Sequence, residues 1–251
     1  MADRILEIGK SALETSDMKA RMLMNNVVNA QTPGYKKSDV VTNSFPVALE
    51  NATKTVENRS NSTLMAPQTV GTYNNLQQGA LFKTGGMTDL AIGGDGYFVV
   101  QSSEGEVFTR DGRMYIDESG RLVTQSGNFP VLGQGGPITV MPGSKLEISK
   151  YGSVMVDDAE IDKIRVVKFE NPKDLRSMNN SFFKIPPEGT AYQEDQNPNI
   201  AQGFIESSNV SVIDEMANLI AVQKSYELAA KIVRTREGNL QSVIEIGRPS
   251  Q

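Results

Sequence analysis

A glycine-rich turn and pairs of neighbouring carboxylates are the parts of this chain whose residue types could carry out chemistry. Residues 93–96 read Gly-Gly-Asp-Gly, which could form a loop around a phosphate group. A phosphate loop has a different glycine spacing and leads into the N-terminus of a helix. Here Tyr97 opens an apolar run typical of a strand. We therefore predict a tight hairpin at these glycines and no nucleotide site.

The acidic neighbours at residues 157–158 and 194–195 are candidates for the two carboxylates of a glycosidase. That chemistry needs two carboxylates held at a defined separation. Adjacent residues of a strand point to opposite faces, so neither pair fits the requirement. The acidic segment at residues 117–120 lacks the ligand spacing of a calcium loop and is predicted to be a turn. We expect no catalytic residue, no cofactor and no metal site.

The amino-acid composition excludes further classes of function. The 251 residues include no His and no Cys, which excludes imidazole bases, cysteine nucleophiles, disulfides and thiolate metal sites. A net charge of -5 and a pI near 5.0 make nucleic-acid binding unexpected. No run approaches the roughly 20 apolar residues of a membrane span, so we expect no membrane insertion. Asp3, Arg4 and Glu7 interrupt the segment where a signal peptide would be apolar, which leaves a cytoplasmic protein or export without cleavage.

The elements that position the remaining side chains begin with two long amphipathic helices at the chain ends. Apolar residues at every seventh position keep one seam on one side of a helix, and such a seam meets another helix. The seam could belong to ordinary core helices or to an assembly surface, and its place at both ends favours assembly. The predicted assembly interface consists of Leu6, Leu13, Ala20, Val27, Val212, Leu219, Tyr226, Val233 and Leu240.

Local signals set the ends of these helices. The first is predicted over residues 3–31, because Pro33 disfavours helix before it and Gly34 permits a turn. The second is predicted to start near Ser211, which with Asp214 resembles a capping box, and to continue to about Ile244.

The middle of the chain has a different character. Residues 36–79 are rich in Asn, Thr and Ser and are predicted to be extended, with a short helical turn near 45–51. They could form a flexible linker or a segment that becomes ordered on assembly. Short apolar clusters separated by turn residues over 80–187 predict an antiparallel folded-over sheet or irregular barrel. The predicted class is α+β: long N- and C-terminal helices (1–35 and 211–251) pair as a coiled-coil-like domain, and an all-β domain (80–187) joins them through 36–79 and the connector 188–210.

Three ordered blocks of sequence resemble one known family. The first contains Asn25, Asn26, Asn29, Pro33, Gly34 and Tyr35 and is similar to the N-terminal signature of the bacterial flagellar rod and hook proteins. Residues 84–98 and 108–112 resemble the central motif of that family. Residues 203–227 resemble its C-terminal motif. Within the family, residues 131–140 and the length of the linker after Tyr35 are most like those of the proximal-rod members.

The resemblance implies a structural subunit of the flagellar basal-body rod, not an enzyme. Its terminal helices would line an inner tube and polymerise with copies of itself and with other rod proteins. It also implies export through the flagellar type III apparatus without a cleaved signal peptide, and a place in the periplasmic part of the basal body. The alternatives are a distal-rod or other axial subunit, a periplasmic carbohydrate-acting enzyme, and a soluble adhesin or binding module.

Overall fold

The chain forms two compact units, each built from segments that are distant in the sequence. The computed structural model describes residues 2–43, 68–141, 143–179, 181–186, 189 and 191–246. The helical unit comprises Met1–Val27, Ser38–Tyr73 and Ser211–Gln251, and the β unit comprises Val28–Lys37 and Asn74–Val210.

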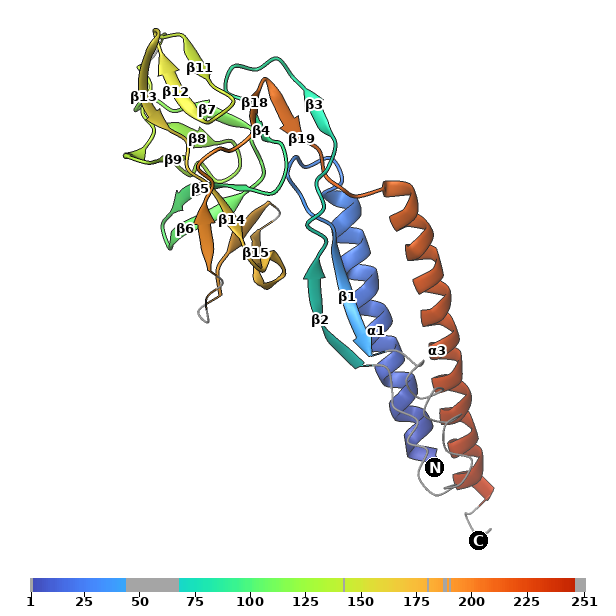
Figure 1. Cartoon of the computed structure of the whole chain (residues 1–251). Coiled ribbons are helices and arrows are strands. Elements are labelled where there is room, and N and C mark those ends of the chain that lie inside the picture. The colour runs from blue at the N-terminus through green and yellow to red at the C-terminus, as the bar shows by residue number, and fades with distance from the viewer. Residues whose placement is uncertain are drawn as a thin grey trace, which may run out of the picture. The chain divides into compact units, whose positions relative to one another are not determined.

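Two long helices and a two-stranded sheet make up the helical unit (Figure 1). Helix α1 spans Ala2–Val28, α3 spans Val212–Ile246, and strand β1 (Ser38–Asn43) pairs with β2 (Gln68–Asn74). Within the described residues, neither helix is apolar enough over a sufficient length to cross a membrane. The predicted helical turn near residues 45–51, like the centre of the expected linker, lies outside the described residues.

The two helices run in opposite directions, as a contact near each end of the pair shows. A Cβ atom added to Gly9 of α1 would lie 2.6 Å from a methyl group of Val233 in α3. Near the other end of the contact, Asn26 Nδ2 of α1 donates a hydrogen bond of 2.9 Å to Glu215 Oε2 of α3. The absence of a side chain at Gly9 therefore leaves room for the Val233 side chain against α1.

The coiled-coil-like pairing predicted from the heptad seams is wrong. Large seam residues would have to interlock as knobs in holes, but Tyr226 of the seam is 45% exposed. Among the helix positions whose burial the structure describes, the buried ones are Gly9, Thr15, Asn26, Glu215 and Ala229, and none of these belongs to the predicted seam. The unit also contains the β1–β2 sheet, which a purely helical tube domain lacks.

Short strands form the β unit, and their pairings within the described residues are antiparallel. Strands β17, β18 and β19 lie within residues 188–210, which were expected to be a connector. The strands are β3 (Leu81–Lys83), β4 (Leu90–Ile92), β5 (Tyr97–Ser102), β6 (Gly105–Thr109), β7 (Met114–Ile116), β8 (Leu122–Thr124), β9 (Leu132–Gly133), β10 (Gly136–Pro137), β11 (Leu146–Ile148), β12 (Ser153–Val156), β13 (Ala159–Lys163), β14 (Val166–Phe169), β15 (Arg176–Asn179), β16 (Phe182–Lys184), β17 (Tyr192–Glu194), β18 (Ile200–Gln202) and β19 (Phe204–Glu206), with a 3₁₀ turn at Pro172–Asp174.

A six-stranded sheet of order β15-β16-β6-β5-β14-β17 separates two hydrophobic clusters. Alternate residues of a strand point to opposite faces. In β5, Phe98 and Val100 accordingly join the larger cluster, whereas Tyr97 and Val99 join the smaller one. Four of the strands divide their apolar side chains in this way, and the other divided pairs are Val107 and Phe108, Val166 and Val167, and Phe182 and Phe183.

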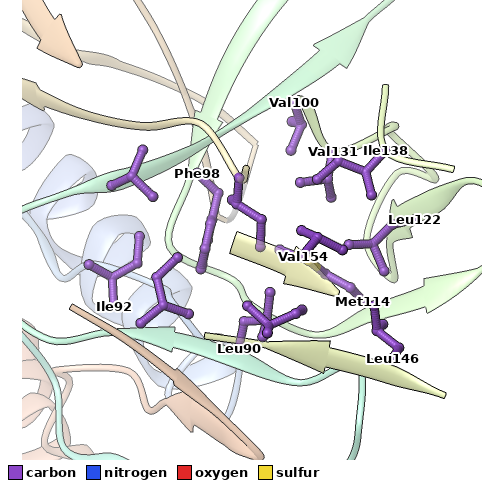
Figure 2. Packing of buried hydrophobic residues seen from close by; sticks show 14 of the residues in the cluster. Leu90, Ile92, Phe98, Val100, Met114, Leu122, Val131, Ile138, Leu146 and Val154 are labelled. Carbon is purple, nitrogen blue, oxygen red and sulfur yellow. The ribbon is translucent and has the colours of Figure 1, made fainter. Parts of the chain in front are cut away.

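The larger cluster is the main core of the β unit (Figure 2). Side chains from the six-stranded sheet meet others from β4, β7, β8, β11 and β12, among them Leu90, Met114, Leu122, Leu146 and Val154. Burial of each large apolar side chain stabilises the fold by about 1.5–3 kcal/mol. This core therefore gives the β unit a source of stability that is independent of the helices.

The hairpin predicted at residues 93–96 is wrong. Strand β4 before the glycines pairs with β18, whereas β5 after them pairs with β6 and β14. Gly93 N–H donates to the carbonyl of Asn199, and Gly94, at φ +101°, donates to Gln78 Oε1. The glycines therefore lead the chain from one sheet into another.

Candidate functional site

Helix α3 carries a second apolar surface on the side away from the contact with α1. At about 100° per residue, Glu215, Ala229 and Val233 lie on one side of the helix. Five large apolar residues lie on the opposite side or at its two edges and are between 51% and 81% exposed. We call this set the outward face; it consists of Ile213, Met216, Ile220, Leu228 and Ile232.

The outward face was not identified from the heptad pattern. The signal for it was present, because spacings of three, four and seven residues place these side chains together on a helix. A helix that is apolar on two sides needs a second partner, since contiguous exposed apolar surface marks an interaction site.

The residues of the predicted seam differ in how far they are buried in the structure. Tyr226 is exposed, and the side chains of Leu6 and Leu240 lie outside those that the structure describes. Each of the others is partly buried, namely Leu13, Ala20, Val27, Val212, Leu219 and Val233.

Asn26 joins three segments of the helical unit. Its Nδ2 donates to Glu215 Oε2 at 2.9 Å and to the Ser38 carbonyl at 2.8 Å, and its Oδ1 accepts from Ser38 N–H at 3.0 Å. Asn26 and Glu215 are both fully buried. The neighbouring Asn25 is exposed. Asn26 therefore fixes α1, β1 and the first turn of α3 to one another.

The segment that follows α1 is packed inside the β unit. Asn29, Pro33, Gly34 and Tyr35 are all buried. Asn29 accepts a hydrogen bond from Thr32 N–H through its carbonyl oxygen at 3.0 Å. Gly34 has φ +70°, and a Cβ atom there would lie 2.3 Å from the backbone nitrogen of Asp111. Both its conformation and this close approach require glycine.

Three buried charges connect the three sequence blocks within the β unit. Lys36 Nζ donates to Glu206 Oε1 at 2.5 Å, and Arg110 Nη1 donates to Glu206 Oε2 at 3.2 Å. Their side chains are at most 2% exposed. We call Lys36, Arg110 and Glu206 the ionic cluster. Each of the three residues lies in or next to one of the sequence blocks, but no local pattern indicated that they would meet.

Further contacts surround the ionic cluster. The Arg110 guanidinium lies over the Tyr97 ring, 4.9 Å from its centroid, and Gly79 N–H donates to Glu206 Oε1 at 2.9 Å. Burial lowers the pKa of the Lys36 ammonium below its ordinary value, while the Glu206 carboxylate acts in the opposite direction. A carboxylate with two cations and a backbone donor is suited to holding segments together.

The acidic residues considered for catalysis have structural roles. Glu194 pairs with Arg165, and Asp195 pairs with Lys168. Residues 157–158 have positive φ and form the turn between β12 and β13. Among the described residues, no group of three or more acidic side chains could hold a metal ion.

Two family models match the chain. The model described as the flagellar hook protein FlgE/F/G D1 domain matches residues 91–156. The model described as the flagellar basal body rod FlgEFG protein C-terminal matches residues 201–246. The first range covers strands of the main core, and the second runs from β18 through α3.

Curated relatives match over nearly the whole chain. The flagellar basal-body rod protein FlgF of Caulobacter vibrioides is 33% identical over 98% of this chain and 99% of its own length. FlgG of Bacillus subtilis is 29% identical over 98% of this chain and 99% of its own length. FlgF of Salmonella typhimurium is 29% identical, covering 91% and 92% of the two chains.

Proposed function

Because this chain belongs to the family of flagellar basal-body rod proteins FlgF and FlgG, we propose that it joins the rod through the outward face of α3. It is a structural subunit of the flagellum and not an enzyme, its place is the basal body, and it assembles with other flagellar axial proteins. The proposal concerns the surface used and the arrangement of the subunit in the rod.

The observation that carries the proposal is the exposure of the outward face. Ile213 is 81% exposed and Leu228 is 65% exposed, although both are large and apolar. Burial of one such side chain contributes about 1.5–3 kcal/mol, so covering the outward face would favour association. In this proposal, helices of neighbouring subunits cover it.

The arrangement follows from open assembly. When one surface of a subunit contacts a different surface of the next copy, each copy is rotated relative to the one before it. If these rotations do not close into a ring, the copies form an open helical filament. In this arrangement the two helices of the helical unit, within residues 1–27 and 211–251, line the inner tube, and the β unit, residues 28–37 and 74–210, lies outside it. The seam residues take part together with the outward face, since several of them are only partly buried in the isolated subunit.

The proposal also covers the position of the subunit along the rod and its route of export. The stretch at residues 131–140 favours the proximal part of the rod, with the distal part as the alternative. Export through the flagellar type III apparatus would bring the subunit to the periplasm without cleavage. N-terminal sequencing of the protein from purified basal bodies tests this, because a cleaved product would lack the first helical residues.

Electron microscopy of basal bodies from a deletion strain tests the proposed role in the rod. We expect particles with membrane rings but without a complete rod or hook, and restoration when the gene is returned. Complete rods in the deletion strain would contradict the proposal.

A further inference from the structure

The exposed side of α1 carries charges in an ordered row. Glu7, Lys10 and Glu14 are exposed, and at about 100° per residue they lie within about 60° of one another around the helix. They point away from the side on which Gly9 faces Val233 of α3. Within the described residues, none of the three forms an ion pair. We call Glu7, Lys10 and Glu14 the α1 row.

The outward face of α3 carries a row of the opposite order. Lys224, Glu227 and Lys231 are exposed, and they also lie within about 60° of one another. In the sequence they stand between Ile220 and Ile232 of the outward face. In the part of the chain that the structure describes, these charges form no ion pairs either. We call Lys224, Glu227 and Lys231 the α3 row.

The two rows are complementary in charge and in spacing. The α1 row reads acid, base, acid and the α3 row reads base, acid, base, each with steps of three and four residues. Each row lies on the side of its helix that faces away from the other helix of the same chain, so the rows cannot meet within one subunit. An antiparallel contact between two copies would form the pairs Glu7–Lys231, Lys10–Glu227 and Glu14–Lys224.

Apolar side chains select the direction of this contact, because the charges alone would also match in a parallel one. The antiparallel register places Met18 of α1, which is 43% exposed, level with Ile220 of α3, which is 55% exposed. The parallel register places Met18 level with the polar Thr235 instead. Exposed ion pairs contribute little energy but fix register and orientation, whereas burial of apolar area favours association. Both criteria agree only for the antiparallel contact.

We propose that the outward face of α3 packs antiparallel on the exposed side of α1 in a second copy of this chain. The register brings Glu14 level with Lys224 and Met18 level with Ile220. The inference rests on the proposed function as a rod subunit, and it names the surface that receives the outward face. The two surfaces differ, so the contact can repeat from copy to copy without closing on itself.

Disulfide cross-linking tests the contact directly, because the chain contains no Cys. Met18→Cys and Ile220→Cys chains, each with its own epitope tag, are expressed together in a deletion strain. Oxidation of purified basal bodies should give a product of twice the subunit mass that carries both tags. Met18→Cys with Thr235→Cys is the matched control for the parallel register, since Thr235 is also exposed. We expect at least about fivefold less product from this control pair.

Each other result has a defined meaning. Equal yields from the two pairs, or a product only with Thr235→Cys, would overturn the antiparallel register. Products that join these variants only to a different protein would overturn the choice of a second copy as the partner. Complete rods without any cross-link would overturn the contact. Failure of the wild-type chain to restore rods would instead contradict the proposed function.

Charge reversal tests the pairing of the two rows. Glu7→Lys with Glu14→Lys should lower incorporation into rods about tenfold, because like charges would then face each other across the contact. Adding Lys224→Glu and Lys231→Glu to the same chain should restore incorporation to within about threefold of wild type. Glu118→Lys with Glu160→Lys is the matched control, since both are exposed acids of the β unit. Normal incorporation of the first variant, or no recovery in the fourfold variant, would overturn the proposed register.

Discussion

The ammonium of Lys36 and the carboxylate of Glu206 form a buried ion pair across 170 positions of the sequence. Lys36 follows the N-terminal motif, and Glu206 ends the last strand before the connection to α3. Arg110 of the central motif binds the other oxygen of the same carboxylate. The three motifs that characterise the sequence thus meet at one carboxylate in the β unit.

Replacement of Glu206 by Gln should destabilise the β unit strongly. Two cations would remain buried without the carboxylate that compensates them, which costs about 3–5 kcal/mol. Urea denaturation followed by circular dichroism measures the change. Glu104→Gln is the control, because the Glu104–Lys184 pair is on the surface, and we expect it to have little effect. Equal stability of the two variants would show that the ionic cluster does not hold the segments together.

Gly34→Ala should be more harmful than the same change at Gly85. Both glycines have similar positive φ values, +70° and +75°, and alanine there costs about 1–2 kcal/mol. An added Cβ at Gly85 meets nothing within 4 Å, whereas at Gly34 it meets the Asp111 backbone at 2.3 Å. Thermal unfolding of both variants separates the cost of the positive φ, which both share, from the cost of the steric overlap with Asp111, which only Gly34→Ala has. Similar melting temperatures would contradict the close packing at Gly34.

Asn26→Ala should loosen the helical unit and leave the β unit intact. The change removes bonds to both backbone groups of Ser38 and to Glu215, with an expected cost of about 1–3 kcal/mol. Asn25→Ala is the matched control because Asn25 is adjacent and exposed. Hydrogen exchange of α1 amides should be faster in the first variant only, and equal exchange in both would refute the bridging role.

Acid should weaken the turn at Asp117. The Arg121 N–H, followed by the Arg121 side chain, lowers the pKa of the Asp117 carboxyl below its ordinary value of 3.8. A depressed pKa in the folded state stabilises above the ordinary value, and that contribution is lost as pH falls through the folded value. The difference in melting temperature between wild type and Asp117→Asn should therefore shrink from pH 7 to pH 3. A difference independent of pH would contradict this assignment.

Local features of the fold could be predicted from the sequence. Ser211 caps the N-terminus of α3 as expected, since its Oγ accepts a hydrogen bond from Asp214 N–H at 3.4 Å. The two residues are only three positions apart in the sequence. The apolar run at Tyr97 is a strand, although its alternation between two clusters was not foreseen. Such features depend on neighbours in the sequence.

Partners that are distant in sequence could not be predicted. The glycines at 93–96 indicate a bend but do not say whether the flanking strands pair with each other. The heptad seam indicates that a helix has a partner but not that Val233 would lie against Gly9. The convergence of Lys36, Arg110 and Glu206 depends on the complete topology of the β unit, which no local pattern contains.

The most direct test of the central claim is incorporation of Ile220→Asp with Leu228→Asp into rods. Both side chains are more than half exposed, so the monomer should keep wild-type stability. Asn218→Asp with Ser225→Asp adds the same charge to exposed polar positions of α3 and is the matched control. In basal bodies purified from a deletion strain, we expect the control protein in complete rods and no rods with the outward-face variant. Normal rods containing the outward-face variant would contradict the account.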